Sequence, residues 1–112
     1  MIARGDIWLV DLDPTRGHEQ KGKRPVLVIS ENAYNNGLAD LVIILPITST
    51  QRAVPTQVHL NPPEGGLKHP SAILCDAIRS VSKERLIKKW GHVLPRTLSN
   101  IETRLKILMG LY

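Results

Sequence analysis

At 112 residues, the chain can bury one modest hydrophobic core, so we expect a single domain over residues 1–112. It contains no run of roughly 18 apolar residues and begins without the apolar segment of a signal peptide, which predicts a cytoplasmic protein without a membrane helix. The single Cys75 excludes an internal disulfide and a cysteine-rich zinc site, and it is expected to be a buried thiol.

The formal net charge is +5, and the basic residues gather in two segments. Residues 79–106 hold eight lysines and arginines against Glu84 and Glu102, and residues 14–24 hold four against Glu19. The rest of the chain has three basic residues against seven acidic ones. This pattern favours a polyanionic partner, either a nucleic acid or an acidic protein, over ordinary solvated lysines.

The first part of the chain predicts two strands joined by a polar loop. Residues 6–12 (DIWLVDL) are apolar with partial alternation, which is typical of a strand. Residues 16–23 form a basic loop that contains two glycines. Residues 25–30 (PVLVIS) are a continuous apolar run, which predicts a strand buried on both faces.

A turn and a third strand follow. Residues 31–40 contain Asn-Asn-Gly, a turn signal because Asn and Gly tolerate positive φ. Residues 41–45 (LVIIL) predict the strand. Pro46 interrupts it by removing a ladder donor, which predicts a bulge or an edge. Three hydroxyl residues then stand in a row at the strand end, over residues 48–50.

Two more strands are expected over residues 55–60 and 71–75, with the turn NPPEGG at residues 61–66 between them. Residues 77–81 leave open one further segment of the sheet.

The last third predicts a short helical piece from Ser82 and a long terminal helix. Residues 86–93 are ambiguous and leave one more strand open. The helix covers residues 95–109, because Pro95 suits a first helical position and Gly110 a stop. Its apolar stripe has 3,4,3 spacing and consists of Leu98, Ile101, Leu105 and Leu108.

Five or six short strands that are not separated by helices, followed by one helix, predict a mainly β fold with a C-terminal helix. We expect a small, mostly antiparallel barrel rather than a doubly wound parallel sheet.

Arg24 stands where the basic loop meets a buried strand. Because it precedes Pro25, its backbone is restricted to extended conformations. An arginine at such a joint is well placed to bind a phosphate, although surface arginines without a function are common. If the second and third strands are neighbours, Arg24 and Thr48 would lie close together.

Thr48, Ser49 and Thr50 have two interpretations. Hydroxyls at a strand end often satisfy nearby backbone groups, and they also bind phosphate oxygens or sugar hydroxyls. Asp76, after the fifth strand, is either a general base or the partner of an arginine such as Arg79.

Histidines and tryptophans give weaker signals. The four histidines lack metal-ligand spacing, and His18 alone lies in the basic loop, where functional residues are common. Trp8 and Trp90 are expected in the core or at an interface rather than as base-stacking platforms, because only 4% of residues are aromatic.

Three stretches resemble the MazF/PemK family of toxin endoribonucleases: residues 5–30 (GDIWLVDLDPTRGHEQKGKRPVLVIS), residues 45–50 (LPITST) and residues 76–81 (DAIRSV). The segment DLDPTRGHEQ is closest to the PemK/Kid branch, and the resemblance extends over essentially the whole chain. It implies a small barrel of the SH3-like, CcdB–MazF type with a C-terminal helix, assembled as a homodimer.

For function, the resemblance implies a type II toxin that cleaves single-stranded RNA, chiefly mRNA, at specific sequences without a metal or cofactor. The products would carry a 2′,3′-cyclic phosphate and a 5′-hydroxyl. The partner would be a cognate MazE/PemI-like antitoxin whose tail covers the RNA site, and through which the complex would bind its operator DNA.

The family's usual catalytic pair matches Arg24 and Thr48. Arginine suits stabilisation of the extra negative charge and is a poor proton donor, while threonine suits binding of a phosphate oxygen. The proton acceptor stays open among Asp76, Glu19 and His18. Residues expected to bind RNA are Gln20, Lys21, Lys23, Ser49, Thr50 and Arg79.

The chain departs from the PemK branch at Leu74, where that branch has an arginine two residues before the aspartate. This substitution places more weight on Arg24 and leaves the role of Asp76 in question. Two alternatives are a CcdB-like gyrase-binding toxin on the same barrel and an interaction barrel without toxicity. Arg24, Thr48 and the basic charge argue against the gyrase-binding toxin, and the interaction barrel stays open.

Overall fold

The computed structural model describes residues 1–13 and 22–112. In these residues the strands are β1 (Asp6–Asp11), β2 (Lys23–Val28), β3 (Leu41–Thr48), β4 (Gln57–Leu60), β5 (Ser71–Leu74), β6 (Arg79–Ser82) and β7 (Leu86–His92). The α-helices are α1 (Asn32–Asn35) and α2 (Pro95–Met109), and the 3-10 turns are η1 (Glu64–Gly66) and η2 (Lys83–Arg85).

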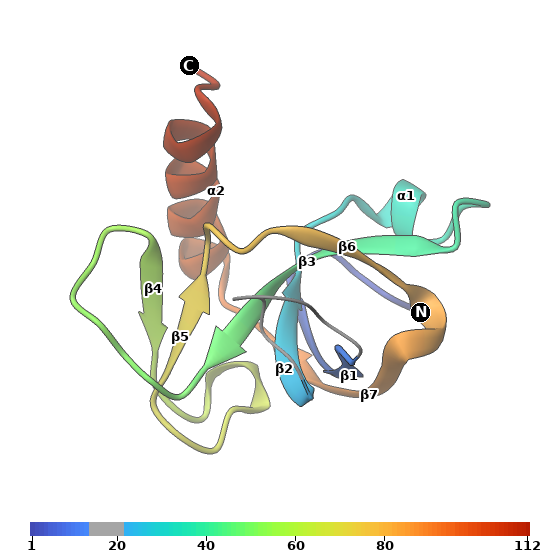
Figure 1. The fold of residues 1–112 in the computed structure, drawn as a ribbon, viewed down its shortest axis with the longest axis horizontal. Coiled ribbons are helices and arrows are strands. Elements are labelled where there is room, and N and C mark those ends of the chain that lie inside the picture. The colour runs from blue at the N-terminus through green and yellow to red at the C-terminus, as the bar shows by residue number, and fades with distance from the viewer. Residues whose placement is uncertain (14–21) are drawn as a thin grey trace.

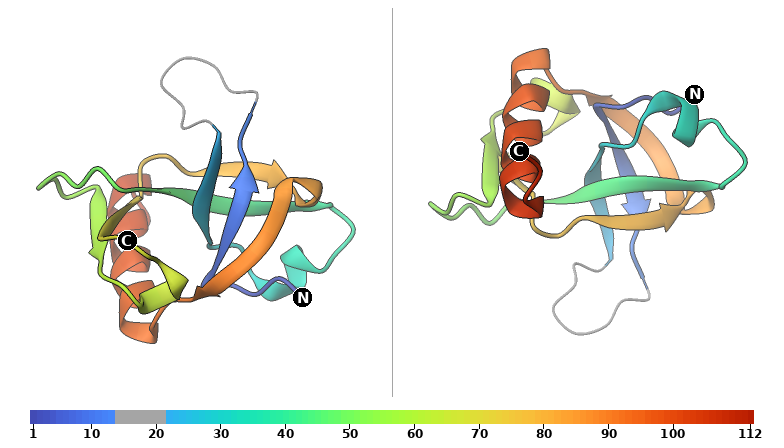
Figure 2. Two further views of the ribbon diagram at one scale, coloured as in Figure 1. Left: turned by 90° about the horizontal axis from the view of Figure 1, so that it is seen from below. Right: turned by 90° about the horizontal axis from the view of Figure 1, so that it is seen from above.

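The seven strands of the described residues form one curled sheet in the order β4-β5-β3-β2-β1-β7, with β6 paired to β3. Every recorded pair is antiparallel. Helix α2 stands beside β4 and β5, at the end of the molecule away from α1 and the N-terminus (Figures 1 and 2). The predicted fold class is therefore confirmed, but the sheet does not close into a ring in the part of the chain that is described.

Strand β3 changes partner along its length. Residues 41–44 pair with β6 and residues 47–48 pair with β5, while β2 runs along its other side. Pro46 lies between these two partners, where a residue without an N–H costs no ladder bond on that side. The strand continues through Pro46, so the predicted interruption is wrong.

Alternating side chains build two apolar clusters on opposite faces of the sheet. In β2, Leu27 joins the first cluster, whereas Val26 and Val28 join the second, and all three are fully buried. The prediction of a strand buried on both faces is confirmed. Helix α2 covers the first cluster with Leu98, Ile101 and Leu105, whereas Leu108 is 45% exposed and lies beyond the contact.

Residues 31–40 contain the one-turn helix α1, where the sequence predicted only a turn. Asn35 is fully buried, and its side-chain amide donates to the carbonyl of Ser30 over 2.9 Å. The Ser30 hydroxyl in turn accepts the N–H of Ile43 at 3.0 Å. Asn35 therefore joins α1 to β3 instead of supplying a positive φ.

Other elements match the prediction with shifted ends. Strand β2 begins at Lys23, before the predicted Pro25, because Lys23 and Arg24 pair with β1. Residues 86–93, which were ambiguous, contain β7. Within the described residues, no helix has the length and apolar character needed to span a bilayer.

Candidate active site

The pairing of β2 with β3 brings Arg24 and Thr48 together. Val26 pairs with Pro46, and two residues further along each strand stand Arg24 and Thr48. Arg24 also pairs with Val10 of β1, and Thr48 pairs with Ala72 of β5. Both residues are half-buried at the end of the sheet. The predicted proximity required β2 and β3 to be neighbours, and this is confirmed.

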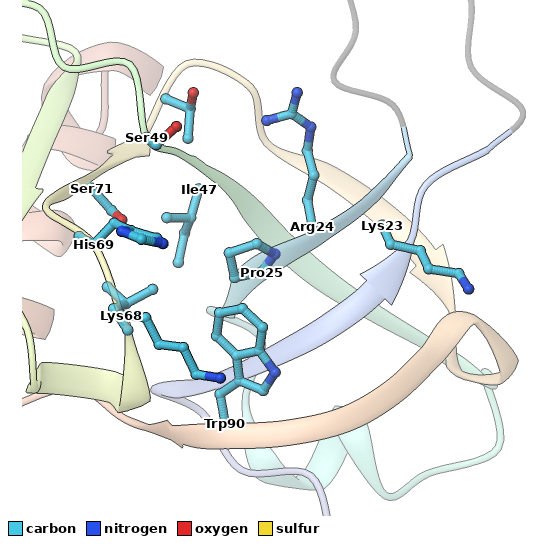
Figure 3. Close-up of a pocket in the computed structure, with 11 residues that line it drawn as sticks. Lys23, Arg24, Pro25, Ile47, Ser49, Lys68, His69, Ser71 and Trp90 are labelled. Carbon is cyan, nitrogen blue, oxygen red and sulfur yellow. The ribbon is translucent and has the colours of Figure 1, made fainter.

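Two cavities share Arg24 and Thr48. The first, here called the Trp90 cavity, measures about 350 Å³ and is also lined by Lys23, Pro25, Ile47, Ser49, Leu67, Lys68, His69, Ser71 and Trp90 (Figure 3). The second, here called the Asp76 cavity, measures about 550 Å³ and is also lined by Thr50, Arg52, Val54, Thr56, Gln57, Leu74 and Asp76. The pair thus lies on the boundary between two hollows.

The structure distributes the other predicted site residues unequally. Lys23 and Ser49 line the Trp90 cavity, and Thr50 and Asp76 line the Asp76 cavity. Arg79 lies on β6 opposite Ile44, outside the residues that line either cavity. Four candidates lie outside the described residues, namely His18, Glu19, Gln20 and Lys21.

Thr48 makes the local contact expected of a strand-end hydroxyl. Its Oγ1 accepts the backbone N–H of Thr50 at 3.2 Å. A hydroxyl has two acceptor lone pairs and one donor, so the Thr48 proton can still be donated to an anion. Next to it, the guanidinium of Arg24 offers several N–H donors and a permanent positive charge. Together these two groups are suited to bind one phosphate.

The chain on either side of residues 14–21 is held by hydrogen bonds. The guanidinium of Arg85 donates to the carbonyls of Asp11, at 3.1 Å, and of Asp13. Asp13 accepts the N–H of Gly22 at 3.0 Å, and the Gly22 carbonyl accepts the N–H of Leu12 at 2.9 Å. These contacts fix the start of β2, and with it the backbone of Arg24.

Sequence reasoning did not single out several residues of the two cavities, among them Lys68, Arg52 and Trp90. Lys68 and Arg52 gave no local signal, because each stands alone in a polar stretch. Trp90 packs against the first core cluster, as expected, but it also lines a cavity. Among the described residues, no three histidines, cysteines or acidic residues lie close enough to hold a metal ion.

Cys75, beside Asp76, is predicted to be chemically inert. It is 1% exposed, as the sequence suggested, and burial raises the pKa of its thiol to about 11 despite the nearby charge of Arg104. Near pH 8, the thiolate fraction should be about 100-fold lower than in the unfolded chain. We expect a disulfide reagent to modify the native protein at least about 100-fold more slowly than the guanidinium-unfolded protein, and equal rates would contradict this burial.

Comparison with known proteins agrees with this architecture. The model of the PemK-like, MazF-like toxins of type II toxin–antitoxin systems matches residues 3–109. Endoribonuclease MazF9 of Mycobacterium tuberculosis is 34% identical over 117 residues, which cover 100% of this chain and 99% of that protein.

Solved structures give the same result. MazF (Form-I) from Deinococcus radiodurans has a TM-score of 0.86 and 30% identity, covering 97% of this chain and 96% of its own. An endoribonuclease in complex with its cognate antitoxin, from a mycobacterial species, has a TM-score of 0.84 and 29% identity, covering 100% and 98%. Since the family model matches nearly the whole sequence, the chain belongs to the PemK-like, MazF-like toxins of type II toxin–antitoxin systems, as its resemblance predicted.

Proposed function

We propose that this toxin is an endoribonuclease that cleaves single-stranded RNA, chiefly mRNA, at Arg24 and Thr48. One observation carries the proposal: the register of β2 and β3 places this arginine and this threonine together between two cavities. A single strand that crosses the boundary would leave its scissile phosphate at the pair and one neighbouring nucleotide on each side.

The reaction is an internal transfer at phosphorus. The 2′-oxygen forms a bond to the adjacent phosphorus, and the bond from phosphorus to the 5′-oxygen breaks. The products are a 2′,3′-cyclic phosphate and a 5′-hydroxyl. Negative charge accumulates on the phosphoryl oxygens in the transition state, where a fixed cation is most effective. Arg24 supplies that cation, and the Thr48 hydroxyl donates to one of the same oxygens.

Two protons must also move. The 2′-hydroxyl loses one to a base, and the leaving 5′-oxygen gains one. Of the three residues that the sequence named as candidate bases, Asp76 belongs to the described residues, and it lines the Asp76 cavity together with Arg24 and Thr48. Leu74, beside it, cannot transfer a proton, so the arginine of the PemK branch has no substitute at that position. His18 and Glu19 stay alternatives.

We also propose the partners that go with this activity. The substrate is in the cytoplasm, and the toxin acts as a homodimer. Its inhibitor is a MazE/PemI-like antitoxin, through which the complex binds its operator DNA. The mycobacterial endoribonuclease, which resembles this chain over its full length and whose structure is a complex with its cognate antitoxin, supports an inhibitor of that kind.

The test is cleavage of a long single-stranded RNA by the purified protein in the presence of EDTA. We expect cuts at discrete positions, with 5′-hydroxyl and 2′,3′-cyclic phosphate ends when the fragments are mapped. Substitution of 2′-deoxyribose at one mapped position should remove that cut alone, because the nucleophile is missing. Intact RNA would reject the proposal, and intact RNA together with stalled gyrase would point to a gyrase-binding toxin.

Binding should depend strongly on salt, since cations surround the pair. The cations that line the two cavities are Lys23, Arg24, Arg52 and Lys68. For a single strand, each phosphate contact contributes about −0.7 to the slope of log affinity against log salt concentration. With four contacts, affinity should fall about 50-fold between about 50 and 200 mM salt. The measurement uses a short RNA that contains one mapped cut with 2′-deoxyribose at that position, so that it stays uncut. A flat profile would contradict the assignment of these cations.

A further inference from the structure

We propose that the Trp90 cavity is a nucleobase subsite, in which one base next to the scissile phosphate stacks on the indole of Trp90 while Lys68 and Lys23 neutralise the adjoining backbone. The inference rests on the RNA cleavage proposed above. It adds a residue that selects the substrate without taking part in the reaction, on the side of the pair opposite Asp76.

Behind the wall that carries Trp90 and Lys68, two backbones are in close contact. A Cβ on Gly66 would lie 2.2 Å from the carbonyl oxygen of Trp90, and a Cβ on Gly91 would lie 2.5 Å from the carbonyl carbon of Gly65. Only glycine permits such an approach between η1 and β7. Because η1 is held against β7, the chain that leaves it brings Lys68 beside Trp90.

The low aromatic content argued against base stacking by Trp90, but its place in the fold gives it the fixed position that a stacking platform needs. It is half-buried and packs against the first core cluster, while it also lines the cavity. Figure 3 shows the side chain of Lys68 extending toward the indole, with Pro25 on the adjoining wall and Arg24 across the cavity. A volume of about 350 Å³ is at the small end of ligand sites, which span about 300–1,000 Å³, and therefore suits a single base.

The charge and polarity of the lining favour a nucleotide. Lys23, Arg24 and Lys68 contribute three cations, and the described residues that line the cavity include no carboxylate. The Ser71 hydroxyl donates to the His69 carbonyl at 2.8 Å, which leaves its lone pairs to accept a base N–H. An aromatic surface bordered by cations is the usual arrangement for binding a base of a single strand.

Position makes a base more suitable than a peptide side chain. Arg24 and Thr48 belong to the lining of this cavity, so its occupant lies next to the phosphate that they bind. The nucleotide adjoining the cut is already tethered there by the substrate backbone.

The experiment compares Trp90→Ala, Trp90→Phe and the wild type on a short RNA that contains one mapped cut. Each RNA is also made with an abasic ribose in place of the base on either side of the cut. Ile87→Ala is the control variant, because Ile87 is exposed on the same strand and does not line this cavity.

We expect Trp90→Ala to lower kcat/KM by roughly 5- to 150-fold on the intact RNA, mainly through KM, since stacking contributes equally before and during the reaction. Trp90→Phe should recover most of the loss. At one flanking position, the abasic RNA should be cut equally poorly by Trp90→Ala and wild type, because the stacking partner is already missing. Ile87→Ala should match the wild type on every RNA.

The failures can be told apart. If the wild type cuts no RNA, the proposed function is rejected and the subsite falls with it. If the wild type cuts RNA but Trp90→Ala is equally active, the subsite alone is rejected. The subsite alone is also rejected if Trp90→Ala lowers kcat/KM by the same factor on the intact RNA and on both abasic RNAs. A shift of Trp90→Ala toward monomer in sedimentation, or weaker antitoxin binding with unchanged RNA kinetics, would reject it in favour of a protein interface.

Discussion

Replacing Arg24 with alanine should lower the rate of RNA cleavage by at least about 10²–10³-fold while leaving the protein folded. Removal of one preorganised donor from a developing anion has an effect of that size, and Arg24 also carries a full charge. The side chain is half-buried at the end of the sheet, outside both core clusters. Its loss should therefore lower the unfolding temperature much less than the loss of a core residue would.

The measurement is single-turnover cleavage of a short RNA, with circular dichroism and thermal unfolding on the same samples. Arg24→Lys should fall between the wild type and Arg24→Ala, because an ammonium keeps the charge but not the planar fork of donors. Arg52→Ala is the matched control, since it removes an exposed cation that lines the same Asp76 cavity, and it should cost less than about 10-fold. Near-normal cleavage by Arg24→Ala would remove Arg24 from the mechanism.

Asp6→Ala should destabilise the fold by about 3 kcal/mol. The Asp6 carboxylate is fully buried and accepts four contacts. These come from the backbone N–H of Ala3 at 2.8 Å, the indole of Trp8 at 3.2 Å, Nδ1 of His92 at 2.9 Å and the ammonium of Lys89 at 3.3 Å. Alanine would leave these donors without their acceptor, and the half-exposed His92 and Lys89 would turn to water most readily.

The same cluster predicts a loss of stability in acid. Burial acts to raise the pKa of Asp6, but the hydrogen bonds from its four partners outweigh burial and hold the pKa below its usual value of 3.8. The stabilisation is therefore present above about pH 4 and is lost as the pH falls through the lowered folded-state value. Denaturant titrations from pH 7 downward should show this loss in the wild type and less of it in Asp6→Ala.

Glu102→Gln is the control for both measurements. Glu102 forms a half-exposed ion pair with Arg4, 2.7 Å apart, and ion pairs near the surface contribute little to stability. It should change the unfolding free energy by less than about 1 kcal/mol. An Asp6→Ala protein as stable as this control would show that the buried cluster does not hold the N-terminal strand.

The terminal helix could be predicted to the residue because its signals are local. Pro95 fixes its start, the apolar spacing marks its buried face, and Gly110 ends it with a φ of 69°. Strand β7 was ambiguous because it is mostly exposed and bulged against β1, so it has no clear period. Pro46 was misread because its tolerance depends on which strands lie on each side of β3.

The candidate site could be predicted only in part, because it also depends on which strands are neighbours. Arg24 and Thr48 were chosen from residue type, strand ends and family resemblance, and their proximity followed once β2 and β3 were neighbours. The inclusion of Asp76 in the same cavity depends on β5, which the sequence does not pair with any strand. Trp90 and Lys68 meet only because two glycine-containing backbones touch, a contact between residues far apart in the chain.

The change of partner along β3 has a consequence for how the two groups of the proposed catalytic pair are held. Arg24 is carried by β2, which is paired with β1, whereas Thr48 lies on the part of β3 paired with β5. The hairpin of β4 and β5 thus contacts the hydroxyl half of the pair through Ala72, whereas the charged half is held by β1. The spacing between the charge and the hydroxyl therefore depends on the register of one strand pair, β2 with β3.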